Sequence, residues 1–368
     1  MPSPASSGAT VAATEAYCAR QGSADFYRPG WGGLTLSSIG LGTYLGEPDN
    51  ETDARYAGAM RRYWQLGGNV VDTAVNYRFQ RSERAIGAAL QESIAAGLVS
   101  RAEVVLCTKG GYLSFDGDWP ADPQAWVQET FLDTGLVQPD EIVDGHCMAP
   151  AYLRHQIAQS LDNLRVACID LYYLHNPEGQ RGVVGDVLFR ERLREAFATL
   201  EVAISQGHIA AYGAATWAGL RAQPTSPDYL SLATLVETAH DVAGDRHHFR
   251  AIQLPLNFQM LEAAGLANQP GSSGQAPLLQ AAAEHDLFVI ASASLLQSRL
   301  VGRLPDRLRA KFEPGLTDAQ RALQFVRSAP GLTVALAGMS SAAHVDENMA
   351  LRAAPRMPAE AWQAALRP

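Results

Sequence analysis

The chain has 368 residues, of which 47% are hydrophobic, and a formal net charge of −9. This length suits two average domains or one large α/β barrel. The negative charge argues against a nucleic-acid backbone or an anionic membrane surface as a partner. The sequence has no apolar run near the roughly 20 residues that span a bilayer. We therefore expect neither nucleic acid nor a membrane among its partners.

The first 22 residues are rich in small side chains but lack a basic segment followed by a long apolar stretch, so they do not resemble a signal peptide. We expect a disordered leader over residues 1–22 and a single domain over residues 23–368. The cysteines show neither CxxC pairing nor metal-ligand spacing, which indicates free, buried or incidental thiols in a reducing cytoplasm. They are Cys18, Cys107, Cys147 and Cys168.

Beyond the leader, short β-branched or leucine-rich runs alternate with longer alanine-rich stretches. We expect strands at 36–41, 69–72, 104–108, 169–174, 209–213, 251–255, 287–292 and 332–336. Helices are expected near 52–66, 82–97, 150–166, 190–206, 228–243, 276–285, 317–328 and 341–350. Eight strand–helix pairs without an obvious linker favour a closed (β/α)8 TIM barrel over an open doubly wound α/β sheet.

A long insert follows the third expected strand, where a barrel loop usually has about 2–6 residues. Residues 112–149 contain eight acidic residues and no Lys or Arg, together with five large aromatic side chains: Tyr112, Phe115, Trp119, Trp126 and Phe131. Because the insert follows a strand, it belongs to the face at the carboxyl ends of the strands. It is either a lid or pocket wall, or a solvated acidic elaboration that its aromatic residues anchor.

Four chemically active side chains stand where the second, third and fourth strands end: Asp72, Tyr77, Lys109 and His175. Each has a structural alternative, since aspartate often caps turns and tyrosine or histidine often packs in loops. A lysine at the end of an apolar strand is less ordinary, because unpaired lysines are rarely buried. Their joint placement at one end of a parallel barrel favours a common active site.

These four side chains suit the reduction of a carbonyl group by hydride, which requires a proton at the carbonyl oxygen. A free phenol, with a pKa of about 10, is a weak acid at neutral pH. A nearby ammonium lowers the phenol pKa, a carboxylate keeps that ammonium charged, and an imidazole can orient the carbonyl. Tyr77, Lys109, Asp72 and His175 fit these tasks in that order.

Several longer segments carry a resemblance to a known family. They are GGNVVDTAVNY (67–77), TKGG (108–111), SLDNLRVACIDLYYLHNPE (160–178) and ALAGMSSAAHVDENMAL (335–351). Together they resemble the aldo-keto reductase superfamily from about residue 34 to residue 351. Residues 26–40 are similar to the N-terminal hairpin that closes the bottom of the barrel in that family.

The resemblance implies a nicotinamide cofactor, usually NADPH, with NADH as the alternative. It also implies that Asp72, Tyr77, Lys109 and His175 form the catalytic tetrad, with Tyr77 as the acid–base residue. The cofactor-binding residues implied on the barrel strands and their ends are Gly42, Thr43, Asp72, Thr216 and Gln253. The implied pyrophosphate loop contains Ala293, Ser294, Leu295, Gln297 and Ser298. The implied adenosine strip contains Gly338, Met339, Ser340, Ser341, His344, Glu347 and Asn348. The start of the adjoining helix also offers free backbone N–H groups to a phosphate.

The chain departs from the family pattern at three places. Ala215 and Thr216 stand where Ser-Asn is frequent, and Leu256 stands where a tyrosine often stacks on the nicotinamide. Residues 338–348 contain no Lys or Arg, and His344 occupies an expected arginine position. Since a charge-assisted bond to phosphate contributes about 1.5–3 kcal/mol, this last departure keeps NADH open as the alternative cofactor.

Other residues have interpretations outside the tetrad. We expect substrate contacts from Tyr44, Tyr112, Trp119, Asn176 and Trp217. Arg78 either binds a substrate carboxylate with its guanidinium or is an ion-paired loop residue. The DRHH run at 245–248 has neither helical nor strand ligand spacing, so we expect no metal site.

The sequence thus predicts an NAD(P)H-dependent oxidoreductase that reduces an aldehyde or ketone, with Tyr77 as the proton donor. The aromatic, acidic insert favours a bulky neutral or cationic small-molecule carbonyl substrate over a small anionic sugar phosphate. One alternative is an NADP-binding sensor or accessory protein with little turnover. Another is a specialised biosynthetic reductase that acts on an imine or enone.

Overall fold

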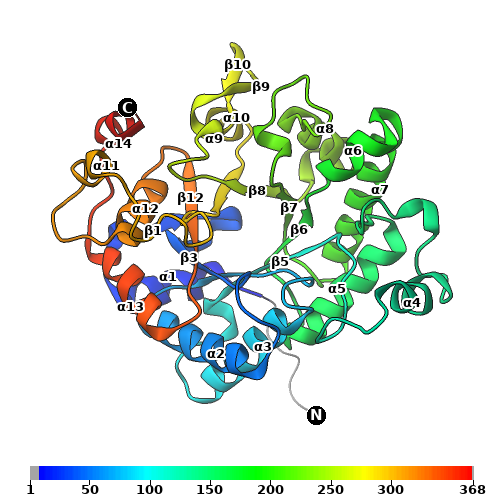
Figure 1. Ribbon diagram of the computed structural model, residues 1–368, viewed down its shortest axis with the longest axis horizontal. Coiled ribbons are helices and arrows are strands. Elements are labelled where there is room, and N and C mark those ends of the chain that lie inside the picture. Colours follow the sequence, from blue (N-terminus) through cyan, green and yellow to red (C-terminus); the bar gives the residue numbers. More distant parts are fainter. Residues whose placement is uncertain (1–7, 367–368) are drawn as a thin grey trace.

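A closed barrel of eight parallel strands forms the centre of the computed structural model, which describes residues 8–366 (Figure 1). The strands are β3 (Ile39–Gly42), β4 (Val70–Asp72), β5 (Val105–Gly110), β6 (Leu171–His175), β7 (Tyr212–Ala215), β8 (Phe249–Pro255), β11 (Phe288–Ser292) and β12 (Leu332–Gly338). Each strand pairs in parallel with its neighbours, and β12 returns to pair with β3. The predicted (β/α)8 TIM barrel is confirmed.

Helices surround the barrel, as Figure 1 shows. The principal ones are α2 (Asn50–Gln65), α3 (Arg81–Ala95), α5 (Pro150–Leu164), α7 (Asp186–Ser205), α8 (Leu232–Ala243), α10 (Leu278–Glu284), α12 (Asp318–Arg327) and α13 (Ala342–Met349). Shorter helices are α6 (Glu178–Val184), α9 (Glu262–Gly265), α11 (Asp306–Arg309) and α14 (Ala359–Leu366). Local signals define several starts: Asp49 caps α2, and Thr317 with Gln320 forms a capping box at α12.

A hairpin closes the end of the barrel at which its strands begin. Strand β1 (Tyr27–Pro29) pairs antiparallel with β2 (Thr35–Ser37). Trp31, Leu34 and Leu36 from this hairpin belong to one buried hydrophobic cluster with strand residues such as Val70 and Val105. The hairpin expected over residues 26–40 is therefore confirmed, and the single strand expected at 36–41 is divided into β2 and β3.

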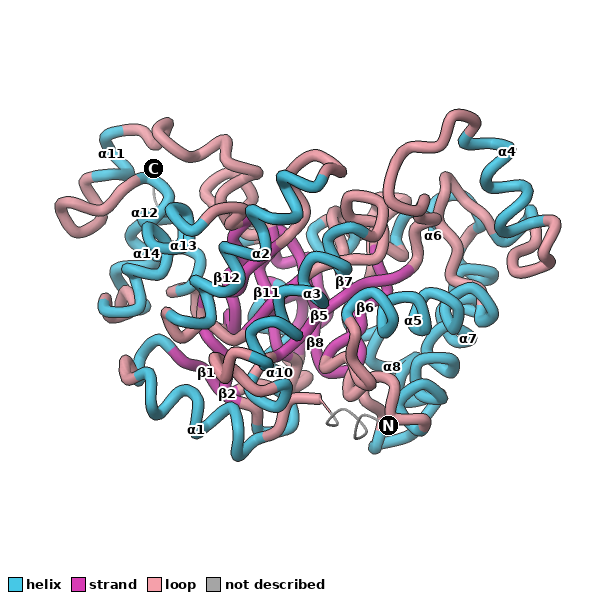
Figure 2. The backbone as a smooth tube through the Cα atoms, turned by 90° about the horizontal axis from the view of Figure 1, so that it is seen from below, coloured by secondary structure: helices cyan, strands magenta, loops and turns pink. Residues whose placement is uncertain are grey.

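The leader predicted to be disordered instead contains a helix, α1 (Val11–Gln21), at the hairpin end of the barrel (Figure 2). The prediction for residues 8–22 was wrong, and residues 1–7 lie outside the described part. The Tyr17 hydroxyl donates to the carbonyl oxygens of Trp64 at 2.6 Å and Gly68 at 3.0 Å. The amide of Ala9 donates to Asp170 at 2.5 Å. These distant partners hold the N-terminal segment in place. The apolar face of α1 is too weak for the sequence to predict a helix.

The insert after β5 has its own small hydrophobic core. It contains α4 (Pro123–Val127), a π-helical turn over Gln128–Leu132 and a 3-10 turn over Pro139–Glu141. Phe131, Val137 and Cys147 pack against Tyr152 of α5. In Figures 1 and 2, α4 lies at the periphery of the barrel rather than over its centre. The insert's role as a lid stays a prediction.

Two smaller features complete the fold. A second hairpin pairs β9 (Ala267–Gly271) with β10 (Gly274–Pro277) outside the barrel. All four cysteines are buried and free, which confirms the expectation of unpaired thiols. Within residues 8–366, no helix has both the length and the apolar character needed to cross a membrane.

Candidate active site

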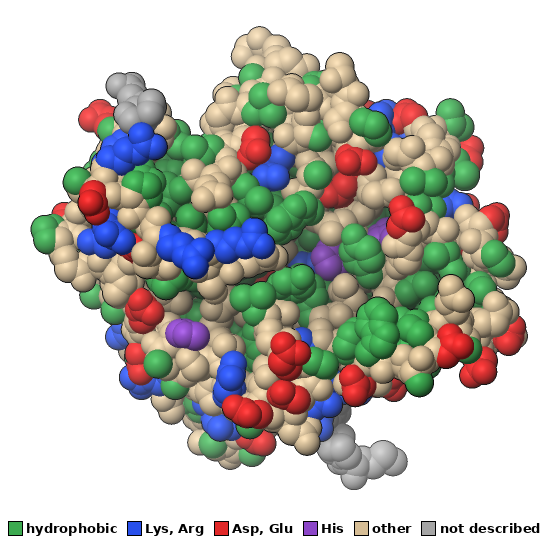
Figure 3. Space-filling view, in the orientation of Figure 1, with side chains coloured by type: hydrophobic (Ala, Val, Ile, Leu, Met, Phe, Trp, Pro, Cys, Tyr) green, Lys and Arg blue, Asp and Glu red, His purple; other side chains and the backbone are tan. Residues whose placement is uncertain are grey.

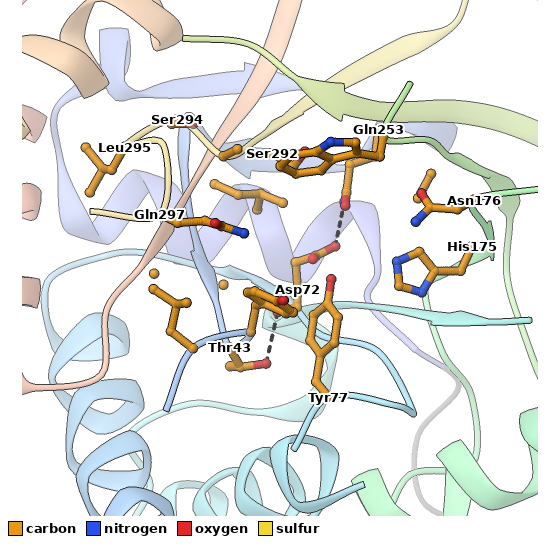
Figure 4. Close-up of a pocket in the computed structure, with 18 of the residues that line it drawn as sticks. Thr43, Asp72, Tyr77, His175, Asn176, Gln253, Ser292, Ser294, Leu295 and Gln297 are labelled. Carbon is orange, nitrogen blue, oxygen red and sulfur yellow. Dashed lines mark hydrogen bonds between the residues drawn. The ribbon is translucent and has the colours of Figure 1, made fainter. Parts of the chain in front are cut away.

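A cavity of about 410 Å³ opens at the carboxyl ends of the barrel strands. Figure 3 shows this face hollowed near its centre, and Figure 4 shows the side chains within the hollow. The lining comes from several strand ends and the loops that follow them. It consists of Gly42, Thr43, Tyr44, Leu45, Asp72, Asn76, Tyr77, Tyr112, His175, Asn176, Ala215, Thr216, Trp217, Gln253, Ser292, Ala293, Ser294, Leu295, Gln297, Ser298, Leu336 and Gly338.

A buried ion pair lies beneath the cavity. Lys109 of β5 is 1% exposed, and its Nζ donates to Asp72 Oδ1 at 2.5 Å and to the Thr73 carbonyl at 2.6 Å. Burial lowers the pKa of Lys109, but the Asp72 carboxylate outweighs this effect and the net pKa is raised. The lysine therefore stays protonated at neutral pH.

The second oxygen of the Asp72 carboxylate is also occupied. Gln253 of β8 donates from Nε2 to Asp72 Oδ2 at 2.7 Å, a bond drawn in Figure 4. The Thr43 hydroxyl donates to Thr73 Oγ1 at 2.9 Å and lies 3.3 Å from the Asp72 carbonyl oxygen. The carboxylate is thus fixed by partners on both neighbouring and opposite strands, which leaves Lys109 little freedom to move.

Tyr77 lies in the loop after β4, and its phenol points into the cavity between Asp72 and His175 (Figure 4). Lys109 Nζ lies 5.0 Å from the centre of the Tyr77 ring, and the His175 ring is 5.9 Å from it. Burial raises the pKa of Tyr77, while the Lys109 charge opposes that rise. The phenol is therefore protonated at neutral pH, as a proton donor must be.

His175 closes β6 and faces the same cavity. Burial, followed by the charge of Lys109, lowers its pKa well below the usual range, so the imidazole is neutral. Its Nδ1 is buried and has no hydrogen-bond partner within residues 8–366. The ring of Tyr112 packs edge-on against it at 5.1 Å. A neutral imidazole with a free nitrogen can orient a polar group of a bound molecule.

Most of the residues implied for cofactor binding line the cavity. They are Gly42, Thr43, Asp72, Thr216, Gln253, Ala293, Ser294, Leu295, Gln297, Ser298 and Gly338. Within the loop after β11, Ala293, Leu296, Gln297 and Ser298 have positive φ values of 52°, 47°, 51° and 68°. Non-glycine residues rarely adopt this conformation, which is concentrated at functional sites.

The rest of the expected adenosine strip lies outside the cavity lining: Met339, Ser340, Ser341, His344, Glu347 and Asn348. Met339 and Asn348 are buried, and the Ser341 hydroxyl caps α13 by accepting from the His344 amide at 3.3 Å. Their roles stay predictions. Two basic residues that the sequence analysis did not single out, Arg299 and Arg303, are exposed on the loop after β11, on the same side of the cavity. Figure 3 shows a band of basic side chains along this edge of the hollow.

Four of the five expected substrate residues line the cavity, namely Tyr44, Tyr112, Asn176 and Trp217. Trp119 does not; it is 62% exposed and packs against Phe79 and Phe115. Its role as a substrate residue stays a prediction.

Five further lining residues were not among the predicted site residues: Leu45, Asn76, Ala215, Ser292 and Leu336. Asn76 precedes Tyr77, and its Oδ1 is buried without a partner within residues 8–366. Its position next to Tyr77, in the segment that begins at Asp72, could have indicated that it lines the cavity. Ser292 ends β11 and Leu336 lies on β12, so alternation along those strands could have indicated both.

Arg78 is an ion-paired loop residue rather than an open binding group. Its guanidinium donates to the carbonyl oxygens of Glu47 and Asp49 at 2.8 and 3.1 Å, and to Asp53 at 2.6 Å. In the DRHH run, Asp245 contacts His240 and His248 contacts Glu201. Within residues 8–366, no cluster of three or more potential ligand side chains is arranged for a metal ion.

A (β/α)8 barrel whose strand ends bring a Lys–Asp pair, a tyrosine and a neutral histidine to one cavity has the architecture of a small-molecule enzyme of the α/β barrel class. The sequence profile of the Aldo/keto reductase family matches residues 38–223, and the chain belongs to this family.

Among characterised sequences, the chain is similar to D-threo-aldose 1-dehydrogenase from a Pseudomonas species. The two are 28% identical over 187 residues, which cover 49% of this chain and 50% of that protein. The chain thus matches about half the length of this relative.

Solved structures share the fold. An aldo/keto reductase from Klebsiella pneumoniae in complex with NADP and acetate is 20% identical, with a TM-score of 0.62, over 92% of this chain and 94% of that one. A glycerol dehydrogenase from Gluconobacter oxydans is 21% identical, with a TM-score of 0.62, over 93% and 94% of the two chains.

Proposed function

We propose that the protein is an NAD(P)H-dependent oxidoreductase that interconverts a carbonyl group and an alcohol, with Tyr77 as the acid–base residue. The observation that carries this proposal is the arrangement around the cavity. A protonated phenol lies above a lysine that Asp72 keeps charged, and beside a neutral imidazole. Family membership supports the same reaction class.

The cavity fits a nicotinamide cofactor. Thr216 lines the cavity, and its hydroxyl oxygen is buried without a hydrogen-bond partner within residues 8–366. Buried polar groups are normally hydrogen-bonded, so this hydroxyl is expected to bond a polar group of a ligand. Gln253 lies beside it with its amide directed at Asp72. The loop from Ala293 to Ser298 would hold the phosphates. NADPH is our preferred cofactor, and the neighbouring Klebsiella structure, which contains NADP, supports this choice.

A bound nicotinamide supplies hydride in reduction and accepts it in oxidation. In reduction, Tyr77 gives its hydroxyl proton to the carbonyl oxygen, and Lys109 stabilises the phenolate that remains. Asp72 keeps Lys109 charged and in place. His175, as a neutral imidazole, orients the reacting oxygen from the other side. In oxidation, the Tyr77 phenolate takes the proton from the alcohol oxygen.

The cavity favours a neutral, polar substrate. Among the described residues that line it there is no Lys or Arg, and the one carboxylate, that of Asp72, is already paired. Tyr44, Tyr112 and Trp217 offer aromatic faces, while Asn76 and Asn176 offer amide groups. This combination fits a neutral sugar or polyol, and the similarity to D-threo-aldose 1-dehydrogenase supports an aldose. An aldose oxidised at C1 is therefore a substrate to test beside simple aldehydes and ketones.

The test is steady-state turnover by the wild-type protein and by Tyr77→Phe, with NADPH and aldehydes or ketones, and with NADP and aldoses. Removing the acid–base group is expected to lower kcat by about 10²–10⁴-fold. NADPH binding, followed by tryptophan fluorescence, should be retained. Near wild-type kcat in Tyr77→Phe would overturn the mechanism. Tight NADPH binding without turnover on any substrate would favour the accessory-protein alternative.

A further inference from the structure

Glu178 lies three residues after His175, at the start of α6, and its side chain has an unusual set of partners. The carboxylate is buried, and its Oε1 accepts three backbone hydrogen bonds. The donors are the amides of Trp217 at 2.8 Å, Ala218 at 3.0 Å and Gly219 at 3.2 Å. One oxygen atom therefore organises three successive residues of a loop about 40 positions away in the sequence.

That loop directly follows β7 and forms part of the cavity wall. Thr216 and Trp217, its first two residues, both line the cavity. The Thr216 amide is held by the Gln253 carbonyl at 2.8 Å, so the barrel fixes the start of the loop. From Trp217 to Gly219, the backbone amides donate to Glu178. The Trp217 side chain itself is 43% exposed, so its orientation depends on the backbone that carries it.

The packing around Gly219 shows how closely the loop fits against Glu178. A Cβ atom at this glycine would lie 2.9 Å from Glu178 Cβ and 2.9 Å from Leu230 Cγ. Real Cβ atoms essentially never approach other atoms so closely, so a larger residue would force the loop away. Glu178 thus provides the acceptor for the three amide hydrogen bonds, and Gly219 provides the space for the loop to come close enough to form them.

Burial of the Glu178 carboxylate costs free energy, and packing alone does not explain why a carboxylate occupies this position. Glu178 Oε2 is buried and has no hydrogen-bond partner within residues 8–366. Burial of a carboxylate with one unsatisfied oxygen is unfavourable. An apolar side chain could fill the same space, but it would leave the three amides of the loop without an acceptor.

We propose that Glu178 is a positioning residue that holds the loop after β7 in its binding-competent form, and thereby sets the affinity for substrate through Trp217. This inference rests on the proposed function, because it names how the wall of that active site is built. The same carboxylate joins the segment that carries His175 and Asn176 to the segment that carries Thr216 and Trp217. It therefore keeps the two walls of the cavity at a fixed separation.

The experiment compares Glu178→Ala with Glu178→Gln. The glutamine Oε1 can still accept the three amide bonds, whereas alanine cannot. In Glu178→Ala, we expect the KM for the carbonyl substrate to rise about ten-fold or more, with kcat changed less than about three-fold, since misplaced positioning groups have effects of this size. Glu178→Gln should restore KM to within about three-fold of wild type.

A matched control is Glu201→Ala. Glu201 also accepts a backbone amide, that of His248 at 2.7 Å, but this residue precedes β8 and lies at the opposite end of the barrel. Its loss should affect the melting temperature without raising KM. In a Trp217→Ala background, Glu178→Ala should add little further change in KM, because the residue through which Glu178 acts is gone.

Hydrogen exchange gives a readout that does not depend on turnover. The amides of Trp217, Ala218 and Gly219 should be protected in the wild type and in Glu178→Gln, and should exchange faster in Glu178→Ala. Unchanged exchange or unchanged KM in a folded Glu178→Ala protein would overturn the inference, as would an equal rise in KM in Glu201→Ala. Absence of turnover in the wild type would instead count against the proposed function. The exchange comparison would then decide the inference about Glu178 by itself.

Discussion

The Nε2 atom of His146 lies 2.7 Å from the carbonyl oxygen of His175. On its other side, the Gln180 side-chain amide donates to His146 Nδ1 at 3.0 Å. Because Nδ1 accepts, the proton of the neutral ring is on Nε2, and His146 is the donor to His175. The end of the insert therefore holds the backbone of a residue that lines the cavity. Gly111 makes this contact possible, since a Cβ there would lie 2.5 Å from His146 Nε2.

Removal of this donor should disturb the position of His175. We expect His146→Ala to lower kcat/KM about ten-fold, because small displacements of orienting groups have large effects on rate. It should also destabilise the fold by about 1–3 kcal/mol, the usual cost of an unsatisfied buried group. In His146→Gln, the side-chain amide can replace the donor, so kcat/KM should fall less. Equal losses in the two variants would contradict a role for the hydrogen bond. His240→Ala, at an exposed site, is the control for histidine loss in general.

The same histidine should make the protein sensitive to acid. Burial lowers the pKa of His146 to about 4, against about 6.5 in the unfolded chain. Below pH 6.5 the unfolded state binds more protons than the folded state, so stability is full above that pH and falls as the pH approaches 4. This group alone should remove about 2 kcal/mol of unfolding free energy between pH 7 and pH 5. Urea denaturation at both pH values measures the loss. In His146→Gln the loss should be smaller by about that amount, and an identical pH dependence would disprove the assignment.

Lys109 should control both the rate and the pH dependence of the reaction. Its charge opposes the rise in the pKa of Tyr77, so Lys109→Met should raise that pKa further. We expect kcat to fall about 10²–10⁴-fold. In the oxidation direction, which requires the phenolate, the limb of the pH–rate profile that rises with pH should move to higher pH. Lys311→Met replaces the other lysine in the chain and should leave the profile unchanged. If the pH–rate profile of Lys109→Met keeps the limb of the wild type, Lys109 does not control the pKa of the acid–base residue.

The barrel and the meeting of Asp72, Tyr77, Lys109 and His175 around one cavity could be predicted from the sequence for one physical reason. Parallel strands end on the same edge, so polar residues at the ends of apolar runs must meet there. The alternation of short apolar runs with helical stretches was sufficient to locate all eight strands. Asp72 and Lys109 could be placed together without any knowledge of loop directions.

The misses share a different cause, which is dependence on contacts between distant segments. Helix α1 is held by Trp64 and Gly68 through Tyr17, and its own sequence is too weakly apolar to show this. This contact between distant segments is not encoded in local periodicity or spacing. The bonds of Glu178 to the loop after β7 were not predictable for the same reason.

Arg299 and Arg303 should decide between the two nicotinamide cofactors. They are exposed on the loop after β11, whose residues Leu295, Gln297 and Ser298 line the cavity. The strip from Gly338 to Asn348 has no Lys or Arg, so we expect these two side chains to provide the cations for a 2′-phosphate on this side. In the double variant Arg299→Ala/Arg303→Ala, we expect the Kd for NADPH to rise about ten-fold, in line with one lost charge-assisted bond. The Kd for NADH should change less than about two-fold.

Fluorescence titration at two salt concentrations measures both dissociation constants, and the NADPH preference of the wild type should weaken at high salt. Arg194→Ala, on the outer helix α7, removes a charge elsewhere and should change neither constant. Parallel losses for NADPH and NADH would place these arginines on the pyrophosphate instead, and unchanged values would assign the 2′-phosphate to His344 and its neighbouring serines.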